Sequence, residues 1–296
     1  MTQKRWVIQD ILHVTTGFLR DKGIESPRLC AEALLSCQLR KSRVKLYLAF
    51  DQPLSNREVA GYRSLIKRRL AGEPVQYITG HQEFWSLDFL VSPAVLIPRP
   101  ETELLIEEVL RIREENLLPE NHEPILLDLG TGSGAIAISL AREIQNATIW
   151  ASDISFEALA VARANARNHS LDQRIRFCQG DLWRPFSRTA CPFDMIISNP
   201  PYIAAEALKK LPNEVRFHEP RVALDGREHG MHFIERIIAE AADYLKPGGW
   251  ILIEMDPDQA EKALGLIDNT QCFSHGERVM DYQKQYRVVR AQRKHG

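Results

Sequence analysis

The sequence predicts an α/β fold in which a mostly parallel sheet, covered by helices on both faces, follows an N-terminal helical domain. Between residues 124 and 291, short apolar segments alternate with segments of helical periodicity. This alternation is typical of parallel strands that are buried on both faces and joined by helices. Before residue 73, apolar residues recur at helical spacing. We therefore expect a helical domain over residues 1–73 and an α/β domain over residues 99–296.

The N-terminal domain is predicted to consist of amphipathic helices. The first helix has an apolar face and a glycine at its end, formed by Ile8, Ile11, Leu12, Thr15, Leu19 and Gly23. Ser26 and Pro27 predict the N-cap and the first residue of a second helix. Ser55 with Glu58 predicts a capping box at the start of another helix. These signals indicate a small helical domain without internal repeats.

The linker between the two domains, residues 74–98, is predicted to be a β-hairpin. It contains the β-prone stretch VQYITGHQEFWSLDFLVS, with a turn expected at Gly80 and His81. A helix is expected to begin after Pro100, with acidic residues in its first turn. In the α/β domain we expect helices near 134–144, 155–168 and 231–245, strands near 124–129, 147–153, 174–179, 193–198 and 249–254, and a terminal strand pair near 272–278 and 285–291.

The composition argues against several protein classes. The hydrophobic fraction of 44% and the charged fraction of 26% are ordinary for a soluble globular protein. No apolar run approaches the ~18 residues that span a bilayer, and the first residues lack the apolar core of a signal peptide. The five cysteines form no CxxC pair and the nine histidines no HExxH pattern, so we expect neither a metal site nor a disulfide framework. A reducing cytoplasm fits this cysteine usage best.

Charge is distributed unevenly along the chain. Residues 1–72 contain 14 Lys and Arg against 6 Asp and Glu, whereas the remainder contains 24 against 33. The basic N-terminal region predicts either an acidic partner or a solvated helical surface, and the sequence alone does not decide between them.

A glycine-rich loop directly follows the first strand expected in the α/β domain. The stretch DLGTGSG (128–134) provides Gly130, Gly132 and Gly134, which allow a tight turn and a close approach of the backbone to a ligand. Asp153, at the end of the next strand, is suited to accept hydrogen bonds from ribose hydroxyls. Because the loop also satisfies the relaxed dinucleotide fingerprint, these residues predict a nucleoside cofactor without identifying it.

The stretch GDLW (180–183) follows the third strand, where the adenine ring of such a cofactor is expected. Asp181 could accept a hydrogen bond from the adenine amino group. Trp183 offers a stacking face, worth ~1–3 kcal/mol for a base, but a tryptophan of the core is the alternative interpretation.

The stretch SNPPYI (198–203) ends the fourth strand with an asparagine and two prolines. Each proline fixes its own φ, and a following proline pushes Asn199 out of the α region. The Asn199 side chain and the Pro200 carbonyl are therefore polar groups held on a stiff loop. Since ligands bind at the carboxyl ends of strands in doubly wound sheets, this loop and the glycine loop are expected to face one crevice.

Together these motifs resemble a Rossmann-like S-adenosylmethionine-dependent methyltransferase. DLGTGSG is similar to the methionine-binding loop, and NPPY (199–202) is similar to the motif of enzymes that methylate an adenine amino group or a glutamine amide. The resemblance implies that Asn199 and the Pro200 carbonyl accept the two N–H bonds of the substrate nitrogen, while Tyr202 packs on the planar substrate group. Such orientation can supply up to ~7–11 kcal/mol of the barrier.

Two longer stretches make the resemblance more specific. Residues 73–103 and 217–231 are similar to the linker and to the region downstream of NPPY in the release factor glutamine methyltransferases, and the likeness covers essentially the whole chain. That family methylates the glutamine of the Gly-Gly-Gln motif in bacterial peptide chain release factors. The family implies S-adenosyl-L-methionine as cofactor, S-adenosyl-L-homocysteine as product, and a cytoplasmic enzyme whose basic N-terminal domain and hairpin hold the release factor.

The resemblance also implies roles for individual residues. The expected cofactor-binding residues are Gly130, Thr131, Gly132, Ser133, Gly134, Asp153, Asp181, Trp183 and Asn199. The expected substrate-binding residues are Asn199, Pro200, Pro201 and Tyr202, of which Asn199, Pro200 and Tyr202 are expected to act in catalysis. Arg99 and Glu101 are expected either to line the substrate entrance or to cap a helix.

Two alternatives and two departures remain. An adenine-N6 DNA or RNA methyltransferase would share NPPY, but it is not expected to carry the stretch 73–103, and the acidic remainder of the chain is a poor surface for phosphates. A binding protein without catalysis would not need to retain the intact loop, Asp153 and NPPY. Relatives often have a D-x-x-G-x-D-R-V pattern where this chain has DYQKQYRVV (281–289), and an L-x-L-E-x-G strand end is common where it has LIEMDPDQ (252–259), so local turn geometry is in doubt there.

Overall fold

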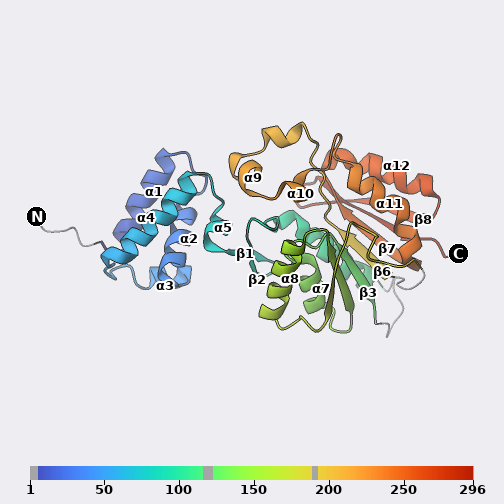
Figure 1. Cartoon of the computed structure of the whole chain (residues 1–296), viewed down its shortest axis with the longest axis horizontal. Coiled ribbons are helices and arrows are strands. Elements are labelled where there is room, and N and C mark those ends of the chain that lie inside the picture. The colour runs from blue at the N-terminus through green and yellow to red at the C-terminus, as the bar shows by residue number, and fades with distance from the viewer. Residues whose placement is uncertain (1–5, 116–122, 189–192, 296) are drawn as a thin grey trace, which may run out of the picture. The chain divides into compact units, whose positions relative to one another are not determined.

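The computed structural model describes residues 6–115, 123–188 and 193–295. The chain forms two compact units, one of Met1–His81 with Pro212–His218 and the other of Gln82–Leu211 with Glu219–Gly296 (Figure 1). The return of 212–218 to the first unit was not indicated by the sequence. Within the described ranges, no helix has both the length and the apolar character that a membrane span requires.

The first unit is helical, as the sequence predicts. Its helices are α1 (Ile8–Asp21), α2 (Pro27–Leu39), α3 (Arg43–Tyr47), α4 (Asn56–Leu70), α5 (Val75–Thr79) and α9 (Asn213–His218). The expected face of α1 is buried, and the Ser55–Glu58 capping box is present. Ser26 is the N-cap residue of α2 and Pro27 is its first residue, as predicted, but the Ser26 backbone is left-handed and its side chain makes no capping hydrogen bond. An ion pair of 2.6 Å between Arg69 and Glu214 joins α4 to α9.

The predicted hairpin is present, but its turn lies elsewhere. The residues expected to begin its first strand form helix α5, which ends at Gly80 in the left-handed conformation. The hairpin pairs β1 (His81–Phe84) with β2 (Leu87–Leu90). Its turn is formed by Trp85 and Ser86, at φ 51° and 55°. Two successive positive φ values give a turn whose twist matches that of the paired strands. Neither residue of this turn is a glycine, so the sequence contains no signal for a turn at this position.

The second unit contains a seven-stranded sheet, which confirms the predicted fold class. Its strands are β3 (Ile125–Leu129), β4 (Thr148–Asp153), β5 (Ile175–Gln179), β6 (Phe193–Ser198), β7 (Leu245–Glu254), β8 (Phe273–Met280) and β9 (Tyr286–Arg293). The order is β5-β4-β3-β6-β7-β9-β8, in which β3 to β7 are parallel and the last two are antiparallel. All five expected parallel strands and the terminal pair are therefore found.

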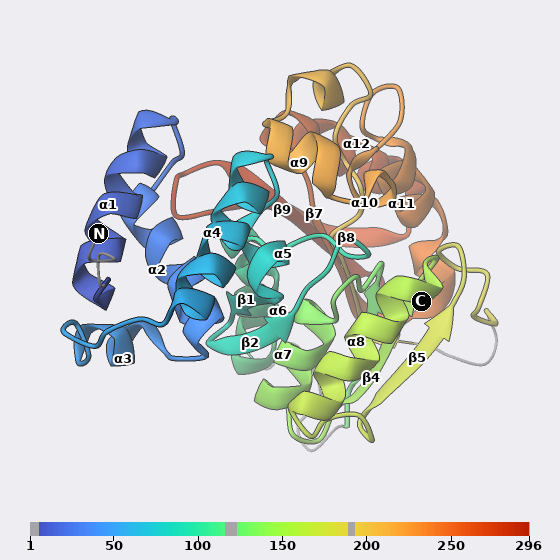
Figure 2. The ribbon, with the colours of Figure 1, turned by 60° about the vertical axis from the view of Figure 1, so that its left-hand side comes forward.

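Helices cover both faces of this sheet (Figures 1 and 2). They are α6 (Glu103–Glu114), α7 (Ala135–Glu143), α8 (Phe156–Asn168), α11 (His232–Tyr244) and α12 (Ala260–Thr270), with short turns η1 (Pro100–Thr102), η2 (Ala207–Lys210), α10 (Arg221–Leu224) and η3 (Pro257–Gln259). Leu126 packs into the core with α6 and α7, whereas Leu127 packs into the core with α11 and α12. Burial on both faces explains why the strands read as continuous apolar runs.

The turn between β8 and β9, where the sequence departs from the family pattern, is closed by Asp281. The Asp281 carboxylate accepts hydrogen bonds from the backbone N–H groups of Gln283 and Gln285, each at 2.9 Å. Lys284 stands at the position for which the resemblance predicts glycine, and its φ is 61°. The turn therefore keeps a left-handed residue without the glycine that would favour it.

Replacing Lys284 with glycine is expected to stabilise the fold by roughly 0.5–1 kcal/mol, because relief of left-handed strain exceeds the added entropy of the unfolded chain. Urea unfolding measures the change. Gln283→Gly, in the same turn but at negative φ, is the matched control and should not stabilise. Equal effects of both variants would contradict the strain argument.

Candidate active site

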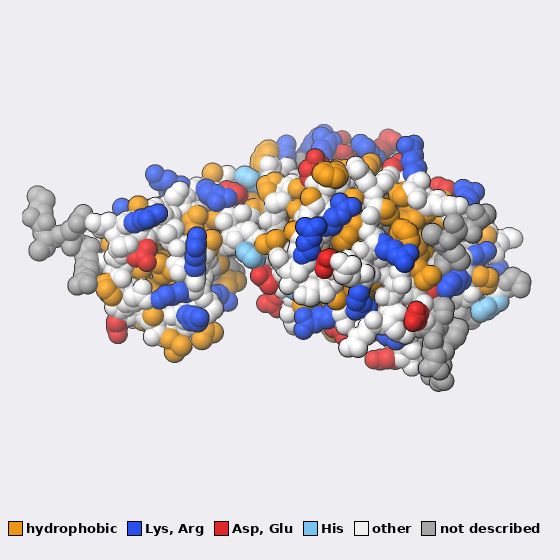
Figure 3. Space-filling model, turned by 60° about the horizontal axis from the view of Figure 1, so that its bottom comes forward, with side chains coloured by type: hydrophobic (Ala, Val, Ile, Leu, Met, Phe, Trp, Pro, Cys, Tyr) orange, Lys and Arg blue, Asp and Glu red, His pale blue; other side chains and the backbone are white. Residues whose placement is uncertain are grey.

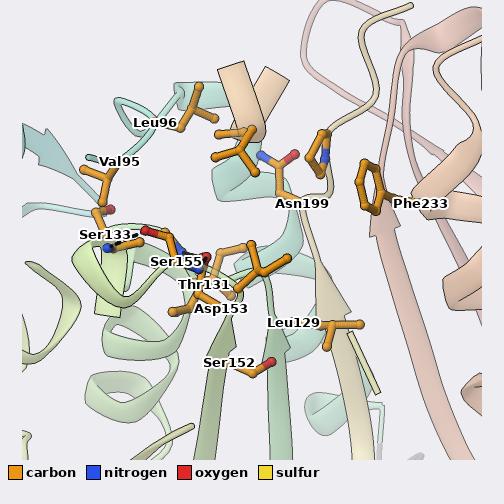
Figure 4. Close-up of a pocket in the computed structure, with 18 of the residues that line it drawn as sticks. Val95, Leu96, Leu129, Thr131, Ser133, Ser152, Asp153, Ser155, Asn199 and Phe233 are labelled. Atoms are coloured by element: carbon orange, nitrogen blue, oxygen red, sulfur yellow. Dashed lines mark hydrogen bonds between the residues drawn. The ribbon is translucent and has the colours of Figure 1, made fainter. Parts of the chain in front are cut away.

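A cavity of about 290 Å³ lies within the second unit, where β3, β4 and β6 end. The glycine loop, Asp153 and Asn199 all line it (Figure 4). In the sheet, β4 and β5 lie on one side of β3, whereas β6 and β7 lie on the other. The connections that follow β3 and β6 therefore leave toward opposite faces of the sheet, which opens a crevice between them. The structure thus brings together the two loops that the sequence placed at one edge.

The glycine loop has the backbone that its composition predicts. Gly132 has a φ of 56°, and no atom lies within 4 Å of the position that a Cβ would take there. Gly134 has a φ of 84°, and a Cβ on it would meet Ile138 Cδ1 at 2.9 Å and Ala162 Cβ at 3.2 Å. Gly132 therefore leaves open space beside the cavity, whereas Gly134 permits close packing of α7 on α8.

Asp153 lies at the end of β4 and lines the cavity. Its two carboxylate oxygens accept hydrogen bonds of 2.9 Å from the backbone N–H groups of Gly132 and Ser155. Burial raises the pKa of Asp153, while these hydrogen bonds act in the opposite direction. Each oxygen keeps a second lone pair for an external donor. Together with the open backbone at Gly132 and the apolar side chains of Ile154 and Leu182, the donor and acceptor set fits a nucleoside cofactor.

Asn165, fully buried on α8, ties the glycine loop to the hairpin. Its Nδ2 donates to the carbonyl oxygens of Ser133 at 2.9 Å and of Leu90 at 3.0 Å. Its Oδ1 accepts from the Leu90 N–H at 2.7 Å. One side chain therefore satisfies three backbone groups of two residues, Leu90 and Ser133, that lie far apart in the sequence.

Asn165→Ala is expected to destabilise the fold by about 2–3 kcal/mol, because it leaves buried backbone groups without partners. The affinity for the expected nucleoside cofactor should fall as well, since the Ser133 carbonyl loses its anchor. Chemical unfolding and calorimetry measure the two effects. The exposed Asn168 of the same helix is the matched control, and Asn168→Ala should change stability by less than about 0.5 kcal/mol. A similar small effect at Asn165 would contradict the anchoring role.

The stretch GDLW is only partly where the sequence placed it. Asp181 lines the cavity, but its carboxylate is paired with both terminal nitrogens of Arg236, at 2.8 and 3.1 Å. The Arg236 guanidinium holds the pKa of Asp181 below its ordinary value. Trp183 is 3% exposed and stacks on Tyr244, with ring centroids 4.6 Å apart. The prediction that Trp183 faces the cofactor is therefore wrong, and Leu182 lines the cavity instead.

The NPPY loop begins from an anchored strand end. The Ser198 hydroxyl donates to the Leu129 carbonyl at 2.6 Å, which joins the ends of β6 and β3. Asn199 lines the cavity, and its Nδ2 donates to the Thr102 hydroxyl oxygen at 3.0 Å. Pro201 also lines the cavity, whereas Pro200 is buried and is not among the residues that line it. In Figure 4 the nitrogen and oxygen of the Asn199 carboxamide point to opposite sides, with the oxygen on the side of Phe233.

Tyr202 points away from the cavity. Its hydroxyl donates to Glu254 Oε1 at 3.4 Å, and its backbone carbonyl accepts from Gln259 Nε2 at 2.8 Å. Burial raises the pKa of the Tyr202 phenol above its ordinary value. The prediction that Tyr202 packs on the substrate is therefore not matched by this arrangement. The aromatic side chain that lines the cavity beside Asn199 is Phe233, at the start of α11.

The segment 219–231 lies directly on the NPPY loop. The Ile203 N–H donates to the Leu224 carbonyl at 3.0 Å, and the Gly226 N–H donates to the Ile203 carbonyl at 2.9 Å. A Cβ on Gly230 would lie 2.2 Å from the Tyr202 carbonyl oxygen. This close approach of two backbones explains why a glycine stands at that position of the stretch 217–231.

The two residues expected at the substrate entrance differ in their positions. Arg99 lines the cavity and pairs with the buried Glu219, whose other oxygen accepts from the Ile97 N–H at 3.3 Å. Glu101 lies in the first turn of η1 and is not among the residues that line the cavity, and η1 has no side-chain capping hydrogen bond, so neither expected role of Glu101 is seen. The residue of this stretch that contacts Asn199 is Thr102, which the sequence analysis did not single out.

Two buried carboxyl groups make the fold sensitive to pH. Burial raises the pKa of Asp128 and of Glu254 to about 7. Hydrogen bonds lower both pKa values by a smaller amount, those of Asp128 coming from Thr131 and Ala137 and that of Glu254 from Tyr202. In the folded state these groups retain protons that the unfolded chain has already released. Their contribution to stability is therefore present at low pH and is lost as pH rises toward about 7.

Glu254→Gln is expected to remove part of this dependence, because the amide does not titrate. The variant should be more stable than the wild type at pH 8 and closer to it at pH 5, as measured by urea unfolding. Asp128→Asn should act in the same direction. A variant that keeps the full pH dependence of the wild type would show that the group does not carry a raised pKa.

Comparison with known proteins places the chain among methyltransferases. Residues 10–80 match the family described as PrmC N-terminal domain, and residues 112–216 match the Methyltransferase small domain. A release factor glutamine methyltransferase of Geobacter sulfurreducens is 43% identical over 279 residues, which cover 93% of this chain and 94% of that protein. One of Chlorobaculum tepidum is 39% identical, with 95% of this chain and 96% of that protein covered.

Solved structures show the same fold at low sequence identity. The hMettl16 catalytic domain in complex with MAT2A 3′UTR hairpin 6 has a TM-score of 0.56 at 16% identity, covering 75% of this chain and 80% of that one. The Thermus thermophilus 16S rRNA N2 G1207 methyltransferase, in complex with AdoMet and guanosine, has a TM-score of 0.50 at 21% identity, covering 72% and 50%. At these identities the likeness concerns the fold alone.

Proposed function

The chain belongs to the release factor glutamine methyltransferases, and from this premise we propose the reaction that it catalyses. It transfers the methyl group of S-adenosyl-L-methionine to the side-chain amide nitrogen, N5, of the glutamine in the Gly-Gly-Gln motif of bacterial peptide chain release factors. The alternative, methylation of adenine N6, is not favoured, because the relatives that match over most of the chain are glutamine methyltransferases.

One observation carries the proposal. Asn199 lines the same cavity as the glycine loop and Asp153, and its Nδ2 is engaged by Thr102 at 3.0 Å. The carboxamide oxygen, which is the acceptor of the group, is thereby left to face a donor from outside. A primary amide of the substrate offers such a donor at the nitrogen that receives the methyl group.

The residues of the chain act by binding and orientation. S-Adenosylmethionine would supply an electrophilic methyl group on a sulfonium sulfur, with the neutral thioether of S-adenosylhomocysteine as the leaving group, and the proton that the methylated nitrogen gives up would pass to solvent. Gly130 to Gly134 and Asp153 would hold the cofactor, with the Asp153 carboxylate accepting a hydrogen bond from the ribose. Asn199 Oδ1 and the Pro200 carbonyl accept the two amide N–H bonds, which aims the nitrogen lone pair at the methyl group and stabilises the positive charge that develops there. Pro201 and Phe233 enclose the planar amide.

The first unit is proposed to hold the release factor. Arg57, Arg63 and Lys67 are exposed on α4, and Lys and Arg side chains are spread over the face of this unit that Figure 3 shows. A basic surface favours an acidic partner and speeds its association. The cytoplasm is the proposed location, because release factors act there on ribosomes.

A methyl-transfer assay tests the reaction. A bacterial release factor and an adenine-rich RNA are offered separately with S-adenosylmethionine, and both products are examined by mass spectrometry. The expected result is one methyl group on the Gly-Gly-Gln glutamine and none on adenine. Methyl on adenine, with an unmodified release factor, would overturn the proposal.

Asn199→Ala is expected to lower kcat by at least about 100-fold, because the substrate amide loses an acceptor that it needs in the transition state. Its affinity for the cofactor, measured by calorimetry, should stay within about threefold of the wild type, a difference below 1 kcal/mol. Asp153→Ala is the reciprocal variant, and it should weaken cofactor binding by about 10- to 100-fold. Wild-type turnover by the Asn199 variant would refute the amide-holding role.

A further inference from the structure

An ion pair at the cavity connects the loop after β5 to helix α11. The Asp181 carboxylate accepts hydrogen bonds from both terminal nitrogens of Arg236, from Nη1 to Oδ1 at 3.1 Å and from Nη2 to Oδ2 at 2.8 Å. Both residues line the cavity, and Arg236 is not among the residues that the sequence indicates. A bidentate pair of this kind fixes the plane of the carboxylate as well as its position.

The loop after β5 has supports that do not involve the Arg236 side chain. The Trp183 indole Nε1 donates to the main-chain carbonyl of Arg236 at 3.3 Å, and the Trp183 ring stacks on Tyr244 of the same helix. The Arg184 N–H closes the loop on the Asp181 carbonyl at 3.2 Å. The side-chain pair is therefore not needed to attach the loop to α11, and its specific effect is on the Asp181 carboxylate.

Apolar side chains stand beside this carboxylate in the cavity. Leu182 lines the cavity with a left-handed φ of 48°. Ile154, which follows β4, lines it too and is 53% exposed, which is unusual for so apolar a residue. A planar base fits against such side chains if its polar edge finds a hydrogen-bond partner. Asp181 provides that partner.

The chemistry of the pair determines which base is accepted. An ionised carboxylate can only accept hydrogen bonds, and the pair with Arg236 leaves a second lone pair on each oxygen. Within the described ranges, no further hydrogen bond reaches these two oxygens. The amino group of adenine can donate to them. The carbonyl oxygen that hypoxanthine carries at the same ring position cannot, and the carboxylate would repel it.

We propose that Arg236 is a positioning residue of the cofactor site, which holds the Asp181 carboxylate as a fixed acceptor for the adenine amino group and so makes the site selective for adenine. Arg236 acts through Asp181, because a carboxylate without the guanidinium fork is free to turn about its Cβ–Cγ bond. The inference goes beyond the proposed function. It concerns the base of the S-adenosyl cofactor and is independent of the substrate that receives the methyl group.

The test is calorimetry of the full chain with two ligands, S-adenosylhomocysteine and S-inosylhomocysteine, in which hypoxanthine replaces adenine. The wild type is expected to bind the adenine compound about 10- to 100-fold more tightly, as for a hydrogen bond to a charged group. Arg236→Met should lower the affinity for the adenine compound by about fivefold or more and reduce the preference to about threefold or less, because the acceptor is no longer pre-organised.

The matched control is Arg184→Met. Arg184 is the other arginine near this carboxylate, with its Nε 4.0 Å from Asp181 Oδ2, but its side chain is 81% exposed and does not line the cavity. This variant should keep both the affinity and the preference of the wild type, since an exposed pair at that distance contributes little. Arg236→Lys keeps the charge without the fork, so its preference should lie between those of the wild type and Arg236→Met.

Asp181→Asn is a second, independent variant, which tests the acceptor even if Arg236→Met fails to fold. Its amide has nearly the shape of the carboxylate and can present either a donor or an acceptor to the base. The preference for adenine over hypoxanthine should therefore disappear. An adenine preference of wild-type size in Asp181→Asn would show that this carboxylate does not read the base.

Three further outcomes would overturn the inference. A wild type that binds both compounds equally has no acceptor for the amino group. An unchanged preference in Arg236→Met would show that Asp181 does not need its partner. An equal loss of affinity for both compounds in Arg236→Met would indicate a general structural role. Because calorimetry needs no release factor, these results are separate from those of the methyl-transfer assay, and either proposal can fail without the other.

Discussion

The parallel pairing of β3 with β6 is the constraint on which the site depends. Leu126, Leu127 and Asp128 stand opposite Met195, Ile196 and Ile197 in this pair. The register places the ends of both strands at the same edge of the sheet. There the Ser198 hydroxyl donates a hydrogen bond of 2.6 Å to the Leu129 carbonyl. The loop that follows β3 and the loop that follows β6 therefore line one cavity, because the pairing of the strands and not the local conformation of the loops brings them together.

The NPPY loop is stiff for reasons beyond its prolines. Segment 219–231 and Gln259 bind its backbone from one side, while Thr102 and Glu254 hold its side chains from another. These contacts come from segments far apart in the sequence. A group held by several such contacts has little freedom to lose when substrate binds, which is what an enzyme that acts mainly by orientation requires.

The sequence predicted the strands well because each is a continuous apolar run between helices of clear periodicity, and burial on both faces produces that pattern. It predicted that the glycine loop and Asp153 lie at one crevice, because positive φ favours glycine and the ends of neighbouring parallel strands meet at one edge of a sheet. It misplaced the hairpin turn, since β-prone Val75–Thr79 form a helix and the true turn uses Trp85 and Ser86. Tertiary packing decided between those options, and local propensity could not.

The remaining errors concern side-chain direction. The prediction that Trp183 faces the cofactor missed by one residue, because its neighbour Leu182 lines the cavity while Trp183 packs on Tyr244. Thr102 and Glu254 belong to no motif that indicates their contacts with the NPPY loop, which Thr102 makes with Asn199 and Glu254 with Tyr202. These contacts form only when three segments are brought together in space, which no pattern within one segment could reveal.

A crystal structure with S-adenosylhomocysteine and a release factor tests the central claim most directly. The quantity to measure is the distance from the amide nitrogen of the Gly-Gly-Gln glutamine to Asn199 Oδ1. We expect a hydrogen bond of about 2.7–3.2 Å, with Asn199 Nδ2 still on Thr102 and the amide nitrogen directed at the sulfur. A glutamine bound away from Asn199, or a carboxamide turned with its nitrogen toward the substrate, would contradict the account.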